Sequence, residues 1–166
     1  MKICVNMTAR DLFDFSMYNS YSGLTGIINV VFTVGALAVL FVTWNWPTVT
    51  GFQRILLVFC ALIFSVVQPL LLMKKSKKQA ASAGFSAPIT LTLSDKTFTV
   101  EQGGATGDLE WKQVWKVICI RNLYIIKVGP TRAYLIPKRA VEGREKELES
   151  ILKRNLPAGK TKGLKA

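Results

Sequence analysis

The sequence predicts a membrane protein of the α+β class: a two-helix transmembrane hairpin, then a small antiparallel β-barrel or sheet capped by a C-terminal amphipathic helix. Half of its 166 residues are apolar, which is high for a soluble protein of this length. No charged residue lies between Asp14 and Arg54, and a second uncharged stretch runs from Ile55 to Met73. From Ala87 onward the pattern changes to short alternating segments, which are typical of strands.

The two uncharged stretches have the length of membrane-spanning helices. Leu24 to Trp44 contains 21 residues and Ile55 to Met73 contains 19, enough for a helix to cross a hydrocarbon core about 30 Å thick. Neither stretch has the polar stripe of a surface helix, and the rest of the chain is too small to bury both. We therefore expect residues 23–73 to form a transmembrane hairpin rather than a cleaved signal sequence, because a second span follows the first.

Basic residues predict how this hairpin is oriented. The connecting loop, residues 45–51, contains Pro47 and Gly51 but no basic residue, whereas residues 74–84 form a basic linker directly after the second span. Such a distribution places the loop outside and both termini in the cytoplasm. The lysines that flank the span also attract anionic lipid, by about 1 kcal/mol each. They are Lys74, Lys75, Lys77 and Lys78.

Gln68 and Pro69 interrupt the second span. Proline lacks an N–H group and kinks a helix, and the glutamine amide is able to bond to a neighbouring helix or to backbone groups that the kink releases. We interpret the pair as a packing feature and not as a transport site, since functional sites within membranes usually contain ionisable groups.

Residues 1–22 are predicted to be an interfacial segment. Thr8 followed by Asp11 resembles a capping box, and Leu12, Phe15 and Tyr18 then recur on one face at helical spacing. We expect a short helix that lies at the headgroup level before the first span. Binding of a partner protein by these aromatic residues is the alternative.

Residues 85–156 are predicted to form a cytoplasmic module. The segments 89–94 and 97–102 alternate around a two-residue turn, and the apolar face of an antiparallel sheet needs a cover. Residues 142–155 supply it as a helix with an apolar face, and the Gly- and Lys-rich tail, residues 157–166, is expected to be disordered. The further strands are expected at 107–111, 115–122, 123–128 and 132–137.

The order of these segments resembles the YcxB-like family of small bacterial membrane proteins. The resemblance rests on FTVEQGG, DLEWKQVWKV and AYLIPKRAV followed by a charged helix, and it is strongest from Lys96 to Leu152. It implies a C-terminal domain similar to the pleckstrin-homology fold behind two transmembrane helices. It also implies a location in the bacterial inner membrane. It implies no catalytic residue.

Catalytic and metal sites are not expected. The sequence contains no histidine, which removes the commonest general base and metal ligand. Cys4, Cys60 and Cys119 are too far apart in the sequence for a zinc motif or a disulfide framework. The carboxylates fall at turns, in strands and on the helix, where solvated faces account for them. We therefore predict a protein that is not an enzyme and carries no cofactor.

Two tryptophans, Trp111 and Trp115, flank a predicted tight turn. Both could stack on a ligand, but large aromatic residues at such spacing in a small sheet domain more often fill its core. We expect both to be buried.

Basic residues near predicted strand ends are the candidate binding site. Such side chains hold phosphate through charge-assisted hydrogen bonds, and arginine binds it with two donors at once. The alternative is a solvated basic face that only keeps the module near an anionic leaflet. The residues are Lys112, Lys116, Arg121, Lys127, Arg132, Lys138 and Arg139.

The net charge of +12 also suits nucleic acid, but a tethered basic surface with few exposed aromatic residues is expected to meet lipid first. The predicted function is therefore a membrane-anchored binding module for a partner protein or anionic lipid headgroups. The alternative is a structural or assembly subunit whose transmembrane helices perform the recognition.

Overall fold

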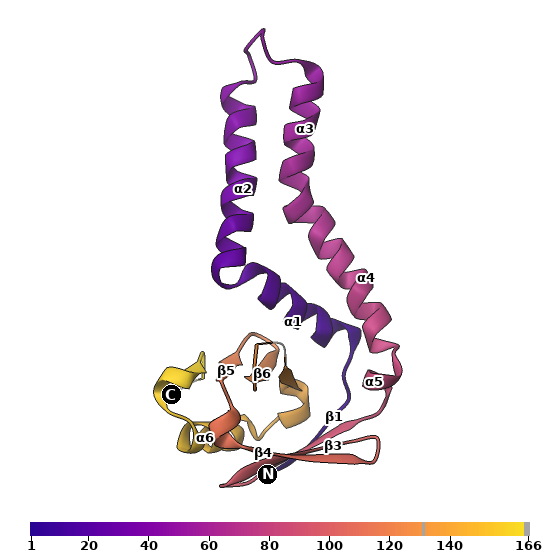
Figure 1. Cartoon of the computed structure of the whole chain (residues 1–166), viewed down its shortest axis with the longest axis vertical. Helices are drawn as coiled ribbons and strands as arrows, with labels where there is room; N and C mark the ends of the chain where they lie inside the picture. The colour runs from indigo at the N-terminus through magenta and orange to yellow at the C-terminus, as the bar shows by residue number, and fades with distance from the viewer. Residues whose placement is uncertain (131, 165–166) are drawn as a thin grey trace.

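The structure, a computed structural model, describes residues 1–130 and 132–164, and it consists of a helical hairpin above a module of two small sheets (Figure 1). The helix α1 lies between the hairpin and the sheets. The helices are α1 (Ala9–Tyr21), α2 (Gly23–Val42), α3 (Gly51–Leu62), α4 (Gln68–Ala80), α5 (Ala83–Ser86) and α6 (Glu145–Asn155). The strands are β1 (Lys2–Val5), β2 (Ile89–Leu93), β3 (Thr97–Gln102), β4 (Ala105–Glu110), β5 (Lys116–Cys119), β6 (Leu123–Lys127), β7 (Ala133–Pro137) and β8 (Thr161–Lys162).

The hairpin contains the two predicted spans. Helix α2 has 20 residues, and the second helix is continuous from Gly51 to Ala80, which is 30 residues. In the most apolar part of each, only 17% and 6% of the residues are buried. Both helices are therefore long and apolar enough to cross a membrane, and their exposed side chains differ from those of core helices in a soluble protein.

The second helix bends at the position that Pro69 predicts. A π-helical segment, Ile63–Val67, joins α3 to α4, and the N–H of Gln68 donates to the carbonyl of Ile63. The carbonyl of Phe64 consequently lacks the usual partner, and Pro69 has no N–H to replace it. The hydroxyl of Tyr21 at the end of α1 donates to this carbonyl instead. This hydrogen bond connects the second helix to α1 at the bend.

Helix α1 begins at the predicted capping box. The backbone N–H of Thr8 donates to the Asp11 carboxylate, and the N–H of Asp11 donates to the Thr8 hydroxyl. At its other end α1 turns tightly into α2. A Cβ at Gly26 would lie 2.1 Å from the Tyr21 carbonyl oxygen, so this turn requires glycine there. The buried Asn29 donates to the Ser20 carbonyl and closes the corner.

The first sheet has the strand order β1-β2-β3-β4 and is antiparallel throughout. Strand β1 corrects the assignment of residues 1–22 to an interfacial segment, because Lys2–Val5 pairs with β2 in the register Ile3 to Leu91. Ile3 and Val5 are buried, and Cys4 between them is exposed. The start of the chain is therefore a strand of the first sheet.

The second sheet has the strand order β7-β6-β5-β8, in which β8 runs parallel to β5. The prediction of a disordered tail is therefore wrong for residues 157–164, while residues 165 and 166 lie outside the described part of the chain. A Gly- and Lys-rich composition is typical of disorder, but without the tail β5 is an edge strand with unpaired backbone groups. The tail pairs with this edge, and Thr161 lies opposite Val117. Lys160 Nζ also donates to the Val114 carbonyl at 2.7 Å.

The two sheets are not closed into a barrel, and they enclose a common core. Phe98 of the first sheet, Tyr124 of the second and Leu152 of α6 are fully buried in it, so α6 covers the inner faces as predicted. A second cluster lies on the opposite face of the second sheet, where Leu12 of α1 packs against Leu123 and other residues of β5 to β7. Helix α1 is therefore a second cover.

The two tryptophans have different environments. Trp111 is 6% exposed, and its indole N–H donates to the Ser94 carbonyl at 2.9 Å, which confirms its predicted place in the core. Trp115 is 60% exposed, so the prediction that it is buried is wrong. The fully buried Val114 takes the inward position next to it, and the following residue then points outward.

Candidate binding site at the junction of the helices and the sheets

The predicted basic set does not form one cluster. Lys116 and Lys127 lie opposite each other on β5 and β6, and Arg132 precedes β7 at the same end of the second sheet. Lys127 Nζ donates to Asn19 Oδ1 at 3.2 Å, which places this end of the sheet next to the last turn of α1. Lys112 is apart from them, in the exposed turn that follows β4.

The remaining three residues lie at the other end of the second sheet. Arg121 is exposed between β5 and β6, and the backbone N–H of Lys138 donates to the Asn122 carbonyl across β6 and β7. The Lys138 ammonium lies 5.5 Å from the centre of the Tyr124 ring, within the range of a cation–π contact. Together with Arg139, Lys138 lines a small polar cleft of about 350 Å³.

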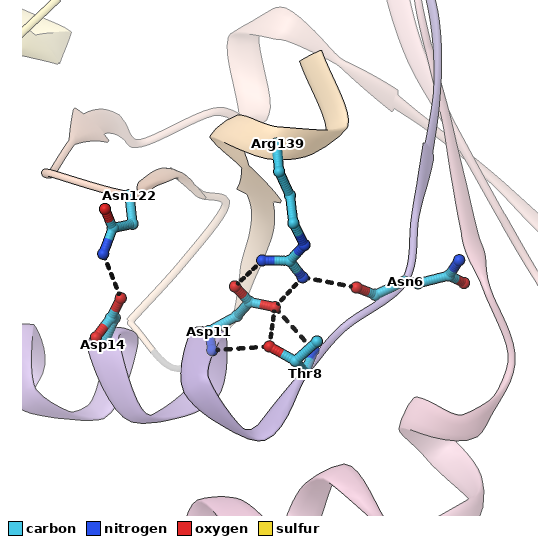
Figure 2. A network of polar contacts seen from close by, with 6 residues as sticks. All are labelled: Asn6, Thr8, Asp11, Asp14, Asn122 and Arg139. Atoms are coloured by element: carbon cyan, nitrogen blue, oxygen red, sulfur yellow. Dashed lines mark hydrogen bonds and ion pairs between the residues drawn. The ribbon is translucent and has the colours of Figure 1, made fainter. Parts of the chain in front are cut away.

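In this cleft Arg139 binds the carboxylate of Asp11, and Figure 2 shows the contacts between the two side chains. Its Nη1 and Nη2 atoms donate to the two carboxylate oxygens of Asp11 at 2.6 and 2.5 Å, and Nη2 also donates to the Asn6 carbonyl at 3.0 Å. Asp11 is 3% exposed. The arginine therefore connects the module to α1, and both of its Nη atoms are already bound to Asp11 rather than to a ligand.

The charges of this cleft partly cancel. Burial raises the pKa of Asp11, but hydrogen bonds from Arg139 and Thr8 outweigh it and hold that pKa below its ordinary value, so the carboxylate is ionised at neutral pH. Asp14, whose carboxylate accepts a hydrogen bond from Asn122, adds a second negative charge. Arg10 and Lys138 remain for an anion, at a site with two carboxylates nearby.

A larger cavity lies elsewhere, where α1, α4 and both sheets meet. Its volume is about 740 Å³, within the range of about 300 to 1,000 Å³ that is usual for small-molecule sites. The chain segment between α4 and β2 closes one side of it. Its walls are mostly apolar, and they include Phe15 of α1, Leu72 of α4, Phe85 of α5, Leu91 of β2 and Leu135 of β7.

Two of the four lysines of the basic linker belong to this cavity. Lys75 and Lys78 line it from α4, together with the amides of Asn19 and Gln79. No Asp or Glu is among the lining residues. Neither ammonium forms a hydrogen bond or ion pair with any other residue of ranges 1–130 and 132–164, so the cavity has two unpaired positive charges beside apolar walls.

This arrangement suits the binding of a ligand. Among the described residues, no group of three His, Cys, Asp or Glu side chains is placed to hold a metal ion. A cavity with cations on one side and apolar walls on the others complements a molecule that has an anionic group and an apolar part.

Sequence reasoning missed the cavity because its walls come from segments that are far apart in the chain. It also missed Asp11, which it regarded only as a capping residue. Two signals were present in the sequence. Leu123 to Ile126 is a strand without alternation, which is typical of a strand covered on both faces, and Lys75 and Lys78 are spaced to share one face of a helix.

Comparison with known proteins supports the resemblance seen in the sequence. Residues 93–152 match the model of a family described as YcxB-like protein, a segment that extends from the end of β2 into α6. The first strand, α1 and the hairpin lie outside the matched segment. No curated protein and no solved structure matches the chain.

Proposed function

The chain carries a YcxB-like domain behind two candidate membrane-spanning helices, and we propose that it is a membrane-anchored module that binds anionic lipid headgroups. The binding takes place on the side of the bilayer where the module lies. The proposal is of a binding protein and not an enzyme, in keeping with a sequence that lacks histidine.

One observation carries this proposal: the basic end of the second helix. Helix α4 continues the apolar run of α3 and then presents Lys74, Lys75, Lys77 and Lys78, all exposed. Within the described ranges, none of these lysines has a hydrogen bond or ion pair. Each is therefore free to interact with an anionic surface, which contributes about 1 kcal/mol per lysine close to the membrane.

The connections between the hairpin and the module support this role. Strand β1 pairs with β2, α1 packs on the second sheet, and Arg139 binds Asp11. A module held by three such connections has little freedom to turn away from the bilayer. Basic groups on it consequently lose less entropy on meeting a headgroup than they would on a flexible tether.

The proposal includes an orientation: both termini lie in the cytoplasm of a bacterial cell, and the loop near Thr48 lies outside the inner membrane. A reporter enzyme that works only outside the cytoplasm tests it. Activity is expected when the reporter is inserted at Thr48, and none when it is fused after Ala166. The reverse pattern would overturn the orientation.

Lipid preference is tested on the full chain in nanodiscs made from equal amounts of phosphatidylcholine and phosphatidylglycerol. Lipids that remain with the protein after extraction in mild detergent are then quantified. We expect phosphatidylglycerol to be enriched over the starting mixture, and less so at high salt. Retained lipid of unchanged composition would contradict the proposal and favour a role as an assembly subunit or a partner-binding protein.

A further inference from the structure

We propose that the cavity between α1, α4 and the two sheets is a binding site for a single anionic lipid molecule. Its headgroup is held by Lys75 and Lys78, and part of an acyl chain lies along the apolar walls. The inference rests on the proposed function, and it goes further by assigning a defined site in place of general attraction to a charged surface.

The position of the cavity favours a lipid over a soluble ligand. Leu72, which contributes to its wall, belongs to the apolar run of the second span, and Lys75 lies one helical turn beyond it. The cavity thus begins where the apolar part of the second helix ends and its lysines begin, and its other apolar walls belong to α1, α5 and the sheets. A lipid in the leaflet has its phosphate at this level, so its headgroup meets Lys75 and Lys78 while part of one acyl chain enters the apolar cavity beside them.

The chemistry of the lining agrees with this occupant. Phe15 and Phe85 line the cavity from α1 and α5, and Leu135 does so from β7. A free phosphate or a small hydrophilic anion gains nothing from such walls, and a neutral apolar ligand leaves two cations unpaired. An anionic lipid satisfies both parts of the cavity.

The four lysines of α4 provide a matched control. Lys75 and Lys78 are three residues apart and line the cavity, whereas Lys74 and Lys77 have the same spacing on the same helix and do not. All four are exposed and lie within one helical turn of each other. Replacing either pair by alanine removes the same charge from almost the same height above the bilayer.

The experiment measures lipid binding to the full chain by native mass spectrometry in detergent, with phosphatidylglycerol and phosphatidylcholine as probes. The unchanged chain is expected to retain one phosphatidylglycerol molecule in preference to phosphatidylcholine. K75A/K78A should weaken retention of that molecule by about tenfold or more, which corresponds to the loss of two charge-assisted contacts. K74A/K77A should weaken it by less than about twofold, the effect of reduced surface charge alone.

A second variant tests the apolar part of the site. Ala133 lines the cavity from β7 and is only half-buried, so Ala133→Phe fills the space without removing a charge. Retention of the single lipid should fall by a similar factor, while an unchanged thermal midpoint shows that the chain remains folded. Ser16→Phe, from the α1 wall, is the equivalent change if Ala133→Phe lowers that midpoint.

The outcomes separate this inference from the proposed function. Equal losses from the two lysine pairs, or no loss from filling the cavity, would overturn the single-lipid site but leave enrichment of anionic lipid in nanodiscs intact. Competition by water-soluble glycerol phosphate as strong as that by phosphatidylglycerol would overturn it too, because the walls would then contribute nothing. Absence of any preference for anionic lipid would reject both.

Discussion

The two sheets of the module differ in how many of their faces are covered. In the first sheet, Leu91 and Leu93 of β2 are buried while Thr92 between them is partly exposed, so one face meets the core and the other meets water. In the second sheet, all residues from Leu123 to Ile126 are at most 1% exposed. Tyr124 and Ile126 point into the common core, whereas Leu123 and Ile125 lie beneath α1.

This difference shows where the membrane segment and the module become one structure. Helix α6 covers the inner faces and lies mostly within the matched family segment, but the cover of the outer face, α1, comes from the residues that lead into the first span. A sheet with two apolar faces is stable only when both have a cover. The second sheet therefore requires the N-terminal segment.

The largest effect is expected from placing a charge inside the common core. Leu152→Asp puts a carboxylate at a fully buried position of α6, between the two sheets, and should destabilise the module by about 4 kcal/mol or more. Lys146→Asp, the same substitution at an exposed position of α6, should change stability by less than about 0.5 kcal/mol. Thermal unfolding followed by tryptophan fluorescence compares them, and similar midpoints would mean that α6 does not cover the sheets.

The next prediction compares the stability that the two faces of β6 contribute. Ile125→Ala, beneath α1, and Ile126→Ala, in the common core, should each cost about 3 kcal/mol, since both side chains are fully buried. Thr92→Ala, on the open face of the first sheet, should cost less than about 1 kcal/mol. Chemical denaturation in detergent measures all three. A small effect of Ile125→Ala alongside a large one of Ile126→Ala would show that α1 does not cover this face.

A third prediction compares a partly buried ion pair with an exposed one. Arg139→Ala leaves the Asp11 carboxylate buried without its main partner and should cost about 2 to 3 kcal/mol. Arg154→Ala removes a pair with Asp95 whose side chains are 63% and 73% exposed, so less than about 0.5 kcal/mol is expected. Equal thermal midpoints for the two variants would indicate that Arg139 does not hold α1 to the module.

The smallest effect is a pH dependence of the same connection. The pKa of Asp11 is lowered by folding, so its contribution to stability is complete above the unfolded value, about 4, and is lost as the pH falls through the lower folded value. Between pH 5 and 8 the Asp11–Arg139 pair should therefore add no slope to the stability curve. Below pH 4, Asp11→Asn should flatten the decline relative to the unchanged chain. A flatter curve for the variant near pH 6 would contradict this assignment.

Much of the fold could be predicted because its signals are local. The spans follow from uncharged stretches of sufficient length, and the strands from β2 to β7 follow from strand-forming residues between turn residues, with Thr97–Gln102 found as expected. The capping box at Thr8 and the bend at Pro69 are likewise read from neighbouring residues. Each of these features depends on a few residues that are close in the sequence.

The remaining features depend on contacts between distant segments. Strands β1 and β8 are short, and no residue pattern in Lys2–Val5 or in the tail indicates that they pair with β2 and β5. The partner of Arg139 lies 128 residues away. The cavity forms only where α1, α4 and both sheets come together. Lys75 and Lys78 differ from Lys74 and Lys77 only in that they line it, which the sequence alone does not show. Periodicity and charge counts contain no information of that kind.

Amide hydrogen exchange on the full chain in lipid nanodiscs tests most directly whether the N-terminal segment is part of the module. Because β1 is an edge strand paired with β2, those amides of Lys2–Val5 that face β2 should exchange slowly, together with the amides of Ile89–Leu93. Those of Leu123–Lys127, covered on both faces, should be among the slowest. Exchange of all amides of Lys2–Val5 at the rate of an unstructured peptide, with the rest of the first sheet protected, would show that the N-terminal segment is not part of the module.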